Sequence, residues 1–191
     1  MTGEVPENLE TERLLLRRWA AADADDFAAM NADPAVLEHI GPPLTREQSD
    51  AYLTRIGRQF DDVGYGLWAV EVRGTGQLVG FTGLAILGHA APTTTAVEVG
   101  WRLVRDAWGQ GYATEAATAA VGLAFGPLAM DELVSITTPD NLRSQAVMRR
   151  LGMRRAPELD FEREQLAPGD PLRPAVVHRL ERHEWARSRR D

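Results

Sequence analysis

The 191-residue chain contains no cysteine and no lysine, and all 21 of its basic residues are arginines. The lack of cysteine excludes disulfides, thiolate nucleophiles and thiolate metal sites. The lack of lysine excludes a Schiff-base lysine and the lysine of a P-loop nucleotide site. Any covalent or phosphate chemistry must therefore rest on other groups.

Long apolar runs and paired histidines are also missing. No apolar run approaches the roughly 18 residues that a membrane helix needs, and the charged N-terminal stretch lacks the apolar core of a signal peptide. We therefore expect a soluble cytoplasmic protein with no membrane partner. The four histidines are scattered, without a ligand-like pairing on a helix face, so no metal is expected. They are His39, His89, His178 and His183.

Charge and composition are those of an ordinary soluble domain. Hydrophobic residues make up 44% and charged residues 26% of the chain, which predicts one globular domain over residues 1–191. The net charge of −7 argues against a nucleic-acid partner and is compatible with an amine substrate. The basic tail "ARSRRD" is expected to be a solvated terminus rather than a binding arm.

Hydrophobic periodicity and capping residues predict the order β-α-α-β-β-β-α-β-α-β-β. The first strand is expected at 13–19 and two helices at 23–33 and 45–60, the second of them opened by Thr45. Three antiparallel strands follow at 67–72, 78–87 and 95–104, with a loop containing Pro92 before the third. A helix at 114–125, a buried strand at 133–138, a helix over 139–152 and a final irregular strand pair, which includes 175–185, complete the chain. This order predicts an α+β domain with a mixed sheet.

The stretch "RDAWGQGYATEA", residues 105–116, places Gly109 and Gly111 directly before a helix start. The first amides of a helix have no internal partner and lie at the positive end of a dipole of roughly half a unit charge. Glycines allow a phosphate to approach those amides. The stretch therefore indicates an anion site.

Several interpretations of this glycine loop compete. A P-loop is excluded because Gly-Lys-Ser/Thr is missing. A dinucleotide-binding site requires a third glycine, where this chain has Thr114. Its glycine loop also lies early in the chain, within parallel β-α-β units. A purely structural turn and a coenzyme A pyrophosphate loop are the remaining alternatives.

Four segments together resemble the GNAT acyltransferase superfamily, in the branch that includes the ribosomal-protein N-terminal acetyltransferases. They are "ETERLLLRRW", "EVGWRLVRDAWGQGYATEA", "NLRSQAVMRRLGM" and "LERHEW". The resemblance covers nearly the whole chain. It implies a mixed, mostly antiparallel sheet with flanking helices, in which the fourth and fifth strands splay apart. The family loop is Gln/Arg-x-x-Gly-x-Gly/Ala, so Trp108 replaces the usual polar first residue.

The resemblance further implies acetyl-CoA as cosubstrate and direct attack by an amine, without an acyl-enzyme or a metal. The pantetheine arm would bond the backbone of the fourth strand and the pyrophosphate would lie on the loop amides, with Asn141 on the pantetheine arm and Ser144 near the sulfur. The expected coenzyme-binding residues are Trp101, Arg102, Leu103, Trp108, Gly109, Gln110, Gly111, Tyr112, Ala113, Thr114, Asn141 and Ser144.

Glu98 is the expected general base, because it lies in an otherwise apolar strand just upstream of the thioester position. The alternative is a carboxylate on the solvent face of that strand. Backbone amides near 99–101 are expected to stabilise the oxyanion. Many relatives carry a tyrosine acid seven residues after Asn141, where this chain has Met148. Ser144 or solvent is therefore expected to protonate the thiolate.

The acceptor is expected to be a protein N-terminus or a small-molecule amine. Trp68 and Phe161 are each either a wall of the acceptor site or a core aromatic, and His39 is either at its entrance or a surface residue. A monomer or homodimer is expected. A non-catalytic acyl-CoA-binding module and a nicotinamide-dependent enzyme remain rival functions.

Overall fold

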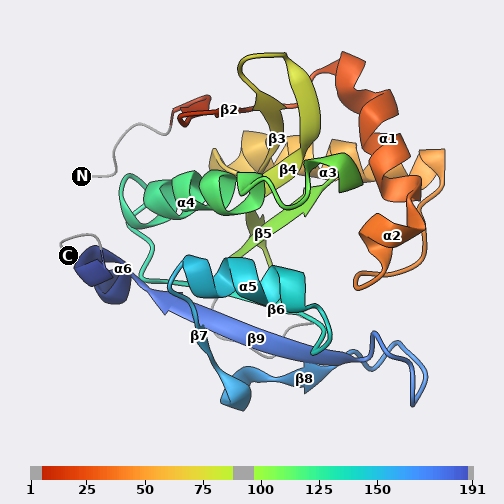
Figure 1. Ribbon diagram of the computed structural model, residues 1–191, viewed down its shortest axis with the longest axis vertical. Coiled ribbons are helices and arrows are strands. Elements are labelled where there is room, and N and C mark those ends of the chain that lie inside the picture. The colour runs from red at the N-terminus through yellow and green to blue at the C-terminus, as the bar shows by residue number, and fades with distance from the viewer. Residues whose placement is uncertain (1–5, 88–96, 189–191) are drawn as a thin grey trace.

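The computed structural model describes residues 6–87 and 97–188, which build one sheet of nine strands with helices on its faces (Figure 1). The strands are β1 Leu9–Glu10, β2 Leu14–Arg17, β3 Leu67–Val72, β4 Gln77–Ile86, β5 Val97–Leu103, β6 Glu132–Thr137, β7 Arg154–Arg155, β8 Phe161–Glu162 and β9 Pro174–Glu181. The α-helices are α1 Ala24–Ala32, α2 Pro34–Leu37, α3 Arg46–Val63, α4 Tyr112–Phe125, α5 Leu142–Arg150 and α6 Arg182–Ser188. Short 3-10 turns lie at Ala21–Asp23, Arg105–Ala107 and Pro157–Leu159.

Local capping explains where the main helices begin and end. Thr45 and Gln48 form a reciprocal capping box at the start of α3, and Gly64 ends that helix with a φ of 78°. At the start of α5 the cap is one-sided: the side chain of Asn141 accepts the backbone N–H of Ser144 at 3.1 Å. The sequence predicted the start of α3 at Thr45, whereas α3 continues past the predicted end at residue 60 to Val63.

The strand order is β1-β2-β3-β4-β5-β6-β9-β7, with β8 pairing beside β9. All neighbouring pairs are antiparallel except β5 and β6. That parallel pair is registered at a single position, Glu98 opposite Val134. Within the described residues the two strands then separate, so the sheet opens between β5 and β6.

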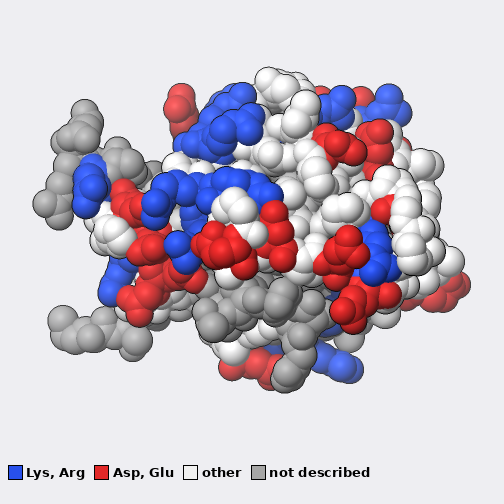
Figure 2. Space-filling model, turned by 90° about the horizontal axis from the view of Figure 1, so that it is seen from below, with Lys and Arg blue, Asp and Glu red and all other residues white. Residues whose placement is uncertain are grey.

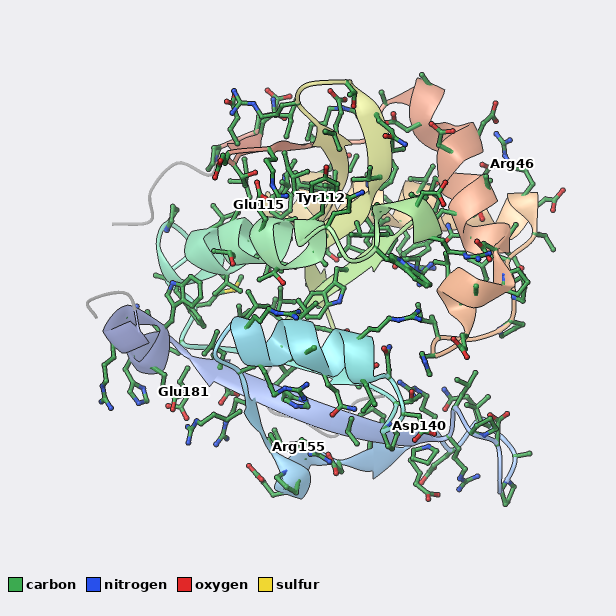
Figure 3. The ribbon with its side chains drawn as sticks, in the orientation of Figure 1. Arg46, Tyr112, Glu115, Asp140, Arg155 and Glu181 are labelled. Carbon is green, nitrogen blue, oxygen red and sulfur yellow. The ribbon has the colours of Figure 1, made fainter. Side chains whose placement is uncertain are left out.

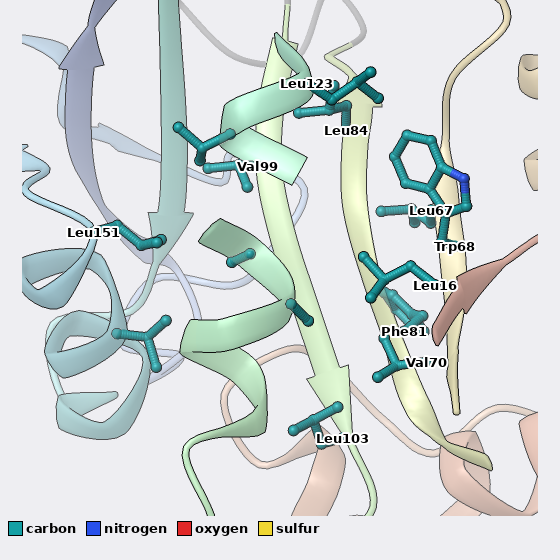
Figure 4. Close-up of a cluster of buried hydrophobic side chains, with 14 of the residues drawn as sticks. Leu16, Leu67, Trp68, Val70, Phe81, Leu84, Val99, Leu103, Leu123 and Leu151 are labelled. Carbon is teal, nitrogen blue, oxygen red and sulfur yellow. The ribbon is translucent and has the colours of Figure 1, made fainter. Parts of the chain in front are cut away.

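Helices cover both faces of the sheet. The α4 helix lies against β4 and β5, where Ala116, Ala117 and Ala120 are fully buried and let the helix approach closely. On the other face, Phe27 of α1 and Tyr52 of α3 pack edge-on, with ring centroids 5.5 Å apart, and both contact Phe81 of β4. Figure 4 shows part of the buried apolar cluster, with side chains from both faces of the sheet, such as Leu123 of α4 and Phe81 of β4.

The α+β class and the mixed, mostly antiparallel sheet are confirmed, but the end of the chain differs from the prediction. A strand was expected to continue through 175–185, whereas β9 ends at Glu181 and α6 follows. Arg182 pairs with Asp131 at 2.6 Å, and Trp185 packs near Phe125 of α4, with ring centroids 6.4 Å apart. Packing against a distant helix therefore sets this conformation. The predicted loop at Pro92, His89 and residues 189–191 lie outside the described residues.

Basic and acidic side chains lie next to one another on the face of the molecule seen from below Figure 1 (Figure 2). Arg173 pairs with Glu162 at 2.6 Å, and Arg155 forms a second ion pair with Asp160. This face carries paired charges of both signs.

Candidate active site

A cavity of about 830 Å³ lies where the start of α4, the start of α5, the end of β5 and the segment after α2 meet. Most of the residues that the sequence suggested for the coenzyme line it. They are Trp101, Arg102, Leu103, Trp108, Gly109, Gly111, Tyr112, Ala113, Thr114, Asn141 and Ser144. Gln110 and Glu98 are not among its lining residues. Segments of the chain that are far apart in sequence therefore converge on one cavity.

The glycine loop presents a row of free backbone donors. Gly109 and Gly111 have φ values of 75° and 82°, a region that glycine adopts without strain. The six consecutive amides from Gly109 to Thr114 donate to no acceptor within residues 6–87 and 97–188. The amide of Trp108, which was expected to join them, instead donates to the carbonyl of Arg105 at 3.0 Å. The free amides thus begin at Gly109.

Sequence reasoning missed the clamp that holds this loop. Arg13 pairs with Glu115 at 2.6 Å, donates to the Gln110 carbonyl at 3.0 Å, and lies 4.8 Å from the ring centre of Tyr112. Figure 3 shows Tyr112 and Glu115 on the side of α4 that faces β2. Thr11 completes the clamp by donating to Glu115 at 2.6 Å. The only signal was the complementary charge of two segments about a hundred residues apart, which does not by itself predict contact.

Trp108 replaces a polar residue of the family loop, and the structure gives the indole two contacts. Its Nε1 donates to the carbonyl of Leu103 at 2.9 Å, which ties the loop to the end of β5. The guanidinium of Arg143 lies 4.6 Å from its ring centre. The tryptophan therefore links β5, the loop and the start of α5 around the cavity.

The start of α5 supplies the other predicted coenzyme residues. Asn141 and Ser144 both line the cavity. The side-chain oxygen of Asn141 accepts the backbone N–H of Ser144. Met148 is fully buried, so the position that holds tyrosine in many relatives contributes here to the core. Ser144 is thus the hydroxyl that α5 presents to the cavity.

Glu98 lies at the position where β5 and β6 pair. Its carboxylate accepts the backbone N–H of Ile136 at 3.1 Å, and the side chain is half-buried. Burial raises the pKa of Glu98 to about 7, although the Ile136 hydrogen bond and the charge of Arg163 oppose that rise. A carboxylate with a pKa near neutrality is suited to proton transfer.

The three aromatic candidates for the acceptor site have different surroundings. Trp68 is 1% exposed and packs edge-on against Phe60, with ring centroids 5.1 Å apart, so it is a core residue. Phe161 is half-buried in β8 and does not line the cavity. His39 does line it, and its Nδ1 lies 3.2 Å from the hydroxyl of Thr138.

The described part of the chain contains neither a group of side chains that could bind a metal ion nor a helix that could span a membrane. Residues 6–87 and 97–188 contain no cluster of three or more His, Asp or Glu side chains able to hold a metal ion. Within the same ranges, no helix is long and apolar enough to cross a membrane.

Comparison with known proteins identifies the family. Residues 13–154 match the model of the acetyltransferase (GNAT) domain, so the protein belongs to the GNAT acetyltransferase family. The FsC-acetyl coenzyme A-N(2)-transacetylase of Aspergillus fumigatus is 28% identical over 197 residues, which span 98% of this chain and 81% of that protein. The solved acetyltransferase of Agrobacterium tumefaciens is 31% identical with a TM-score of 0.76, and the match covers 95% of this chain and 97% of that one.

A protein from Vibrio cholerae described as a ribosomal-protein-serine acetyltransferase is 22% identical with a TM-score of 0.70, over 91% of this chain and 97% of that one. This likeness concerns the fold alone. The resemblance to the GNAT family is confirmed. The protein is therefore an acetyltransferase of a family that uses acetyl-CoA as cosubstrate, and the dinucleotide interpretation of the glycine loop is set aside.

Proposed function

We propose that the protein transfers the acetyl group of acetyl-CoA to a primary amine, on a protein N-terminus or a small molecule, by direct attack. The observation that carries this proposal is the row of free amides from Gly109 to Thr114, which opens α4 beside the separated ends of β5 and β6. The name of the Aspergillus relative describes transfer to a nitrogen, which supports an amine acceptor. We expect a cytoplasmic monomer or homodimer.

The coenzyme fits the cavity by chemistry and by size. Backbone amides at the start of a helix suit a pyrophosphate, because they supply hydrogen bonds at the positive end of the helix dipole. The cavity volume of about 830 Å³ lies within the range of ligand sites, roughly 300–1,000 Å³. The backbone of Trp101, Arg102 and Leu103 would hold the pantetheine arm, and Asn141 would contact it from α5.

The proposed chemistry needs one base, an oxyanion site and one acid. The amine loses a proton to Glu98, directly or through a water, and its nitrogen attacks the thioester carbonyl. The oxyanion that forms is stabilised by backbone amides near Gly100. The C–S bond then breaks, and the thiolate takes a proton from Ser144 or from solvent. Neither a lysine nor a cysteine is required.

The position of Glu98 indicates from which side the amine arrives. Side chains along a strand alternate between its faces, so Glu98 lies on the face opposite to buried Val99. Arg102 shares the face of Glu98 and contacts Tyr52 of α3. The acceptor would therefore approach on the side of α1 and α3, and the coenzyme on the side of α4 and α5.

Two measurements on the purified protein test this function. Calorimetric titration with acetyl-CoA, beside NADH as a control, should show saturable binding of acetyl-CoA alone. A thiol-reactive dye should then detect coenzyme A release when primary amines are added. Binding without release for any amine would contradict the proposed transfer, and binding of NADH instead would contradict the assignment of the loop.

A further inference from the structure

The guanidinium of Arg102 is a half-buried cation without a counter-charge. Among the residues that the structure describes, no carboxylate forms an ion pair with it. Its Nη1 donates to the side-chain carbonyl of Asn31, a residue with 0% exposure, while its Nε is buried and unpartnered. The side-chain amide nitrogen of Asn31 is also buried without a partner. Donors therefore outnumber acceptors at this point.

Arg17 is another half-buried arginine of this chain, and its ion pairs can be compared with the surroundings of Arg102. Two carboxylates, Asp23 at 2.7 Å and Glu71 at 2.8 Å, neutralise its guanidinium. Instead of a carboxylate, Arg102 has the side-chain oxygen of Asn31 and the ring faces of Phe81 and Tyr52, whose centres lie 5.1 and 5.8 Å from its central carbon. Because a buried charge is costly unless it is paired, the contrast indicates that the partner of Arg102 comes from outside the chain.

Arg102 belongs to the wall of the candidate active site and lies on the same face of β5 as Glu98. Gly100 stands between them on that face, and a side chain placed there would meet no described atom within 4 Å. Tyr52 is close to both charges, since the charges of Arg102 and Glu98 both act on the pKa of its hydroxyl. The base and the unpaired guanidinium thus flank the open space over Gly100 on one face of β5, and Arg102 also lines the cavity, which Glu98 does not.

We propose that this space receives an acceptor that carries a carboxylate near its amine, such as a free amino acid, and that Arg102 binds the carboxylate. This inference rests on the proposed function, because it assumes that an amine is acetylated beside Glu98. The amine would lie toward Glu98 and the carboxylate toward Arg102, supported by Asn31. A charge-assisted pair with a guanidinium is among the stronger polar contacts in proteins.

The test compares free amino acids with their carboxamides, such as phenylalanine with phenylalaninamide, in the coenzyme A release assay. The wild-type protein should prefer the acid over the amide by about 10- to 100-fold in kcat/KM, as expected for a charge-assisted contact. Arg102→Gln should remove that preference, chiefly by raising KM for the acid. The matched control Arg18→Gln, which changes an arginine paired with Asp61 outside the site, should keep it.

The wild-type comparison stands even if Arg102→Gln does not fold, and Arg102→Lys, which keeps a charge, should retain part of the preference. Equal rates for acid and amide would overturn the carboxylate assignment while leaving N-acetyl transfer intact. Faster reaction of the amide would overturn it too and favour a peptide N-terminus. If acetyl-CoA binds but no amine of either kind reacts, the proposed function fails and the carboxylate assignment fails with it.

Discussion

At the scale of single residues, the position of Glu98 makes its protonation sensitive to pH near neutrality. Its carboxylate is buried enough to favour the neutral acid, while the Ile136 amide and the charge of Arg163 favour the anion. The balance leaves a pKa of about 7. A general base must be deprotonated to act, so acetyl transfer should speed up as the pH rises through that value.

Replacing Glu98 by glutamine should slow acetyl transfer by about 10²- to 10⁴-fold, the usual contribution of a positioned base. The rising limb of the pH–rate profile near pH 7 should disappear, while calorimetric affinity for acetyl-CoA should stay unchanged. Glu132→Gln is the matched control, because burial also raises the pKa of Glu132 at the start of the neighbouring strand β6. A Glu98→Gln variant with full rate would remove Glu98 as the base.

Gly111 is required by conformation. With a φ of 82° it sits in a region where an L side chain costs roughly 1–2 kcal/mol, and an added Cβ would lie 3.3 Å from Arg13. Gly111→Val should therefore abolish acetyl-CoA binding in a titration while the fold persists. Gly122→Ala lies within α4, where an added Cβ would meet no atom of the described residues within 4 Å; this variant should bind acetyl-CoA normally and raise the free energy of unfolding by about 0.5–1 kcal/mol. Normal affinity in Gly111→Val would contradict the phosphate-loop assignment.

At the scale of elements, the start of α4 depends on β2 for its shape. Arg13 bonds the loop carbonyl of Gln110 and the carboxylate of Glu115, so it fixes the direction of the free amides without lining the cavity itself. The N–H groups of such an anion site point toward the anion only if the backbone keeps its conformation. The clamp is therefore expected to contribute to coenzyme affinity.

Arg13→Ala should weaken acetyl-CoA binding by about tenfold, equivalent to about 1.4 kcal/mol. Arg18→Ala is a matched control, since Arg18 also combines an exposed ion pair, with Asp61, and a ring contact, 5.1 Å from the centre of Phe60. Both variants should lose little stability, because exposed pairs contribute on the order of 0–1 kcal/mol. Equal coenzyme affinity in the two variants would show that the loop keeps its shape without Arg13.

The elements that the sequence predicted well are those with local signals. The capping residue Thr45 predicted the start of α3, and short strand-like apolar runs predicted β3 and β5. The elements that it missed depend on distant partners. The α6 helix forms where a strand was expected, because Trp185 and Arg182 contact α4 and the chain before β6.

The same division holds for the site. The glycine loop and the cap at Asn141 are local motifs, so their residues could be named from the sequence. The clamp on Arg13 and the unpaired state of Arg102 depend on contacts between segments roughly 70 to 100 residues apart. No pattern within one segment carries that information.

At the scale of the whole molecule, His178 links stability to pH. It is 4% exposed in β9, and burial, with the charges of Arg155 and Arg149, lowers its pKa. The folded protein holds it neutral, whereas the unfolded chain binds a proton below about pH 6.5. Because the unfolded state then binds more protons, the contribution of His178 to the free energy of unfolding is complete above that pH and is lost as the pH falls.

Denaturant unfolding of the wild type and of His178→Phe, measured between pH 8 and pH 5, tests this linkage. The difference in their free energies of unfolding should shift in favour of the variant on acidification, by up to about 1.4 kcal/mol per pH unit below pH 6.5. Glu98, whose raised pKa acts in the opposite direction, is common to both proteins and cancels. A pH-independent difference would show that His178 does not contribute to the pH dependence of the free energy of unfolding.

The separation of β5 from β6 also bears on how the molecule unfolds. The sheet has two halves, β1 to β5 and β6 to β9, which are joined at one registered backbone position, Glu98 opposite Val134. Cooperative unfolding of the two halves therefore depends on side-chain packing beneath α4 and α5. A coenzyme lodged in the gap would contact both halves at once. Its binding energy would then join the two halves into one unfolding unit, and the free protein would have a weaker link along that line.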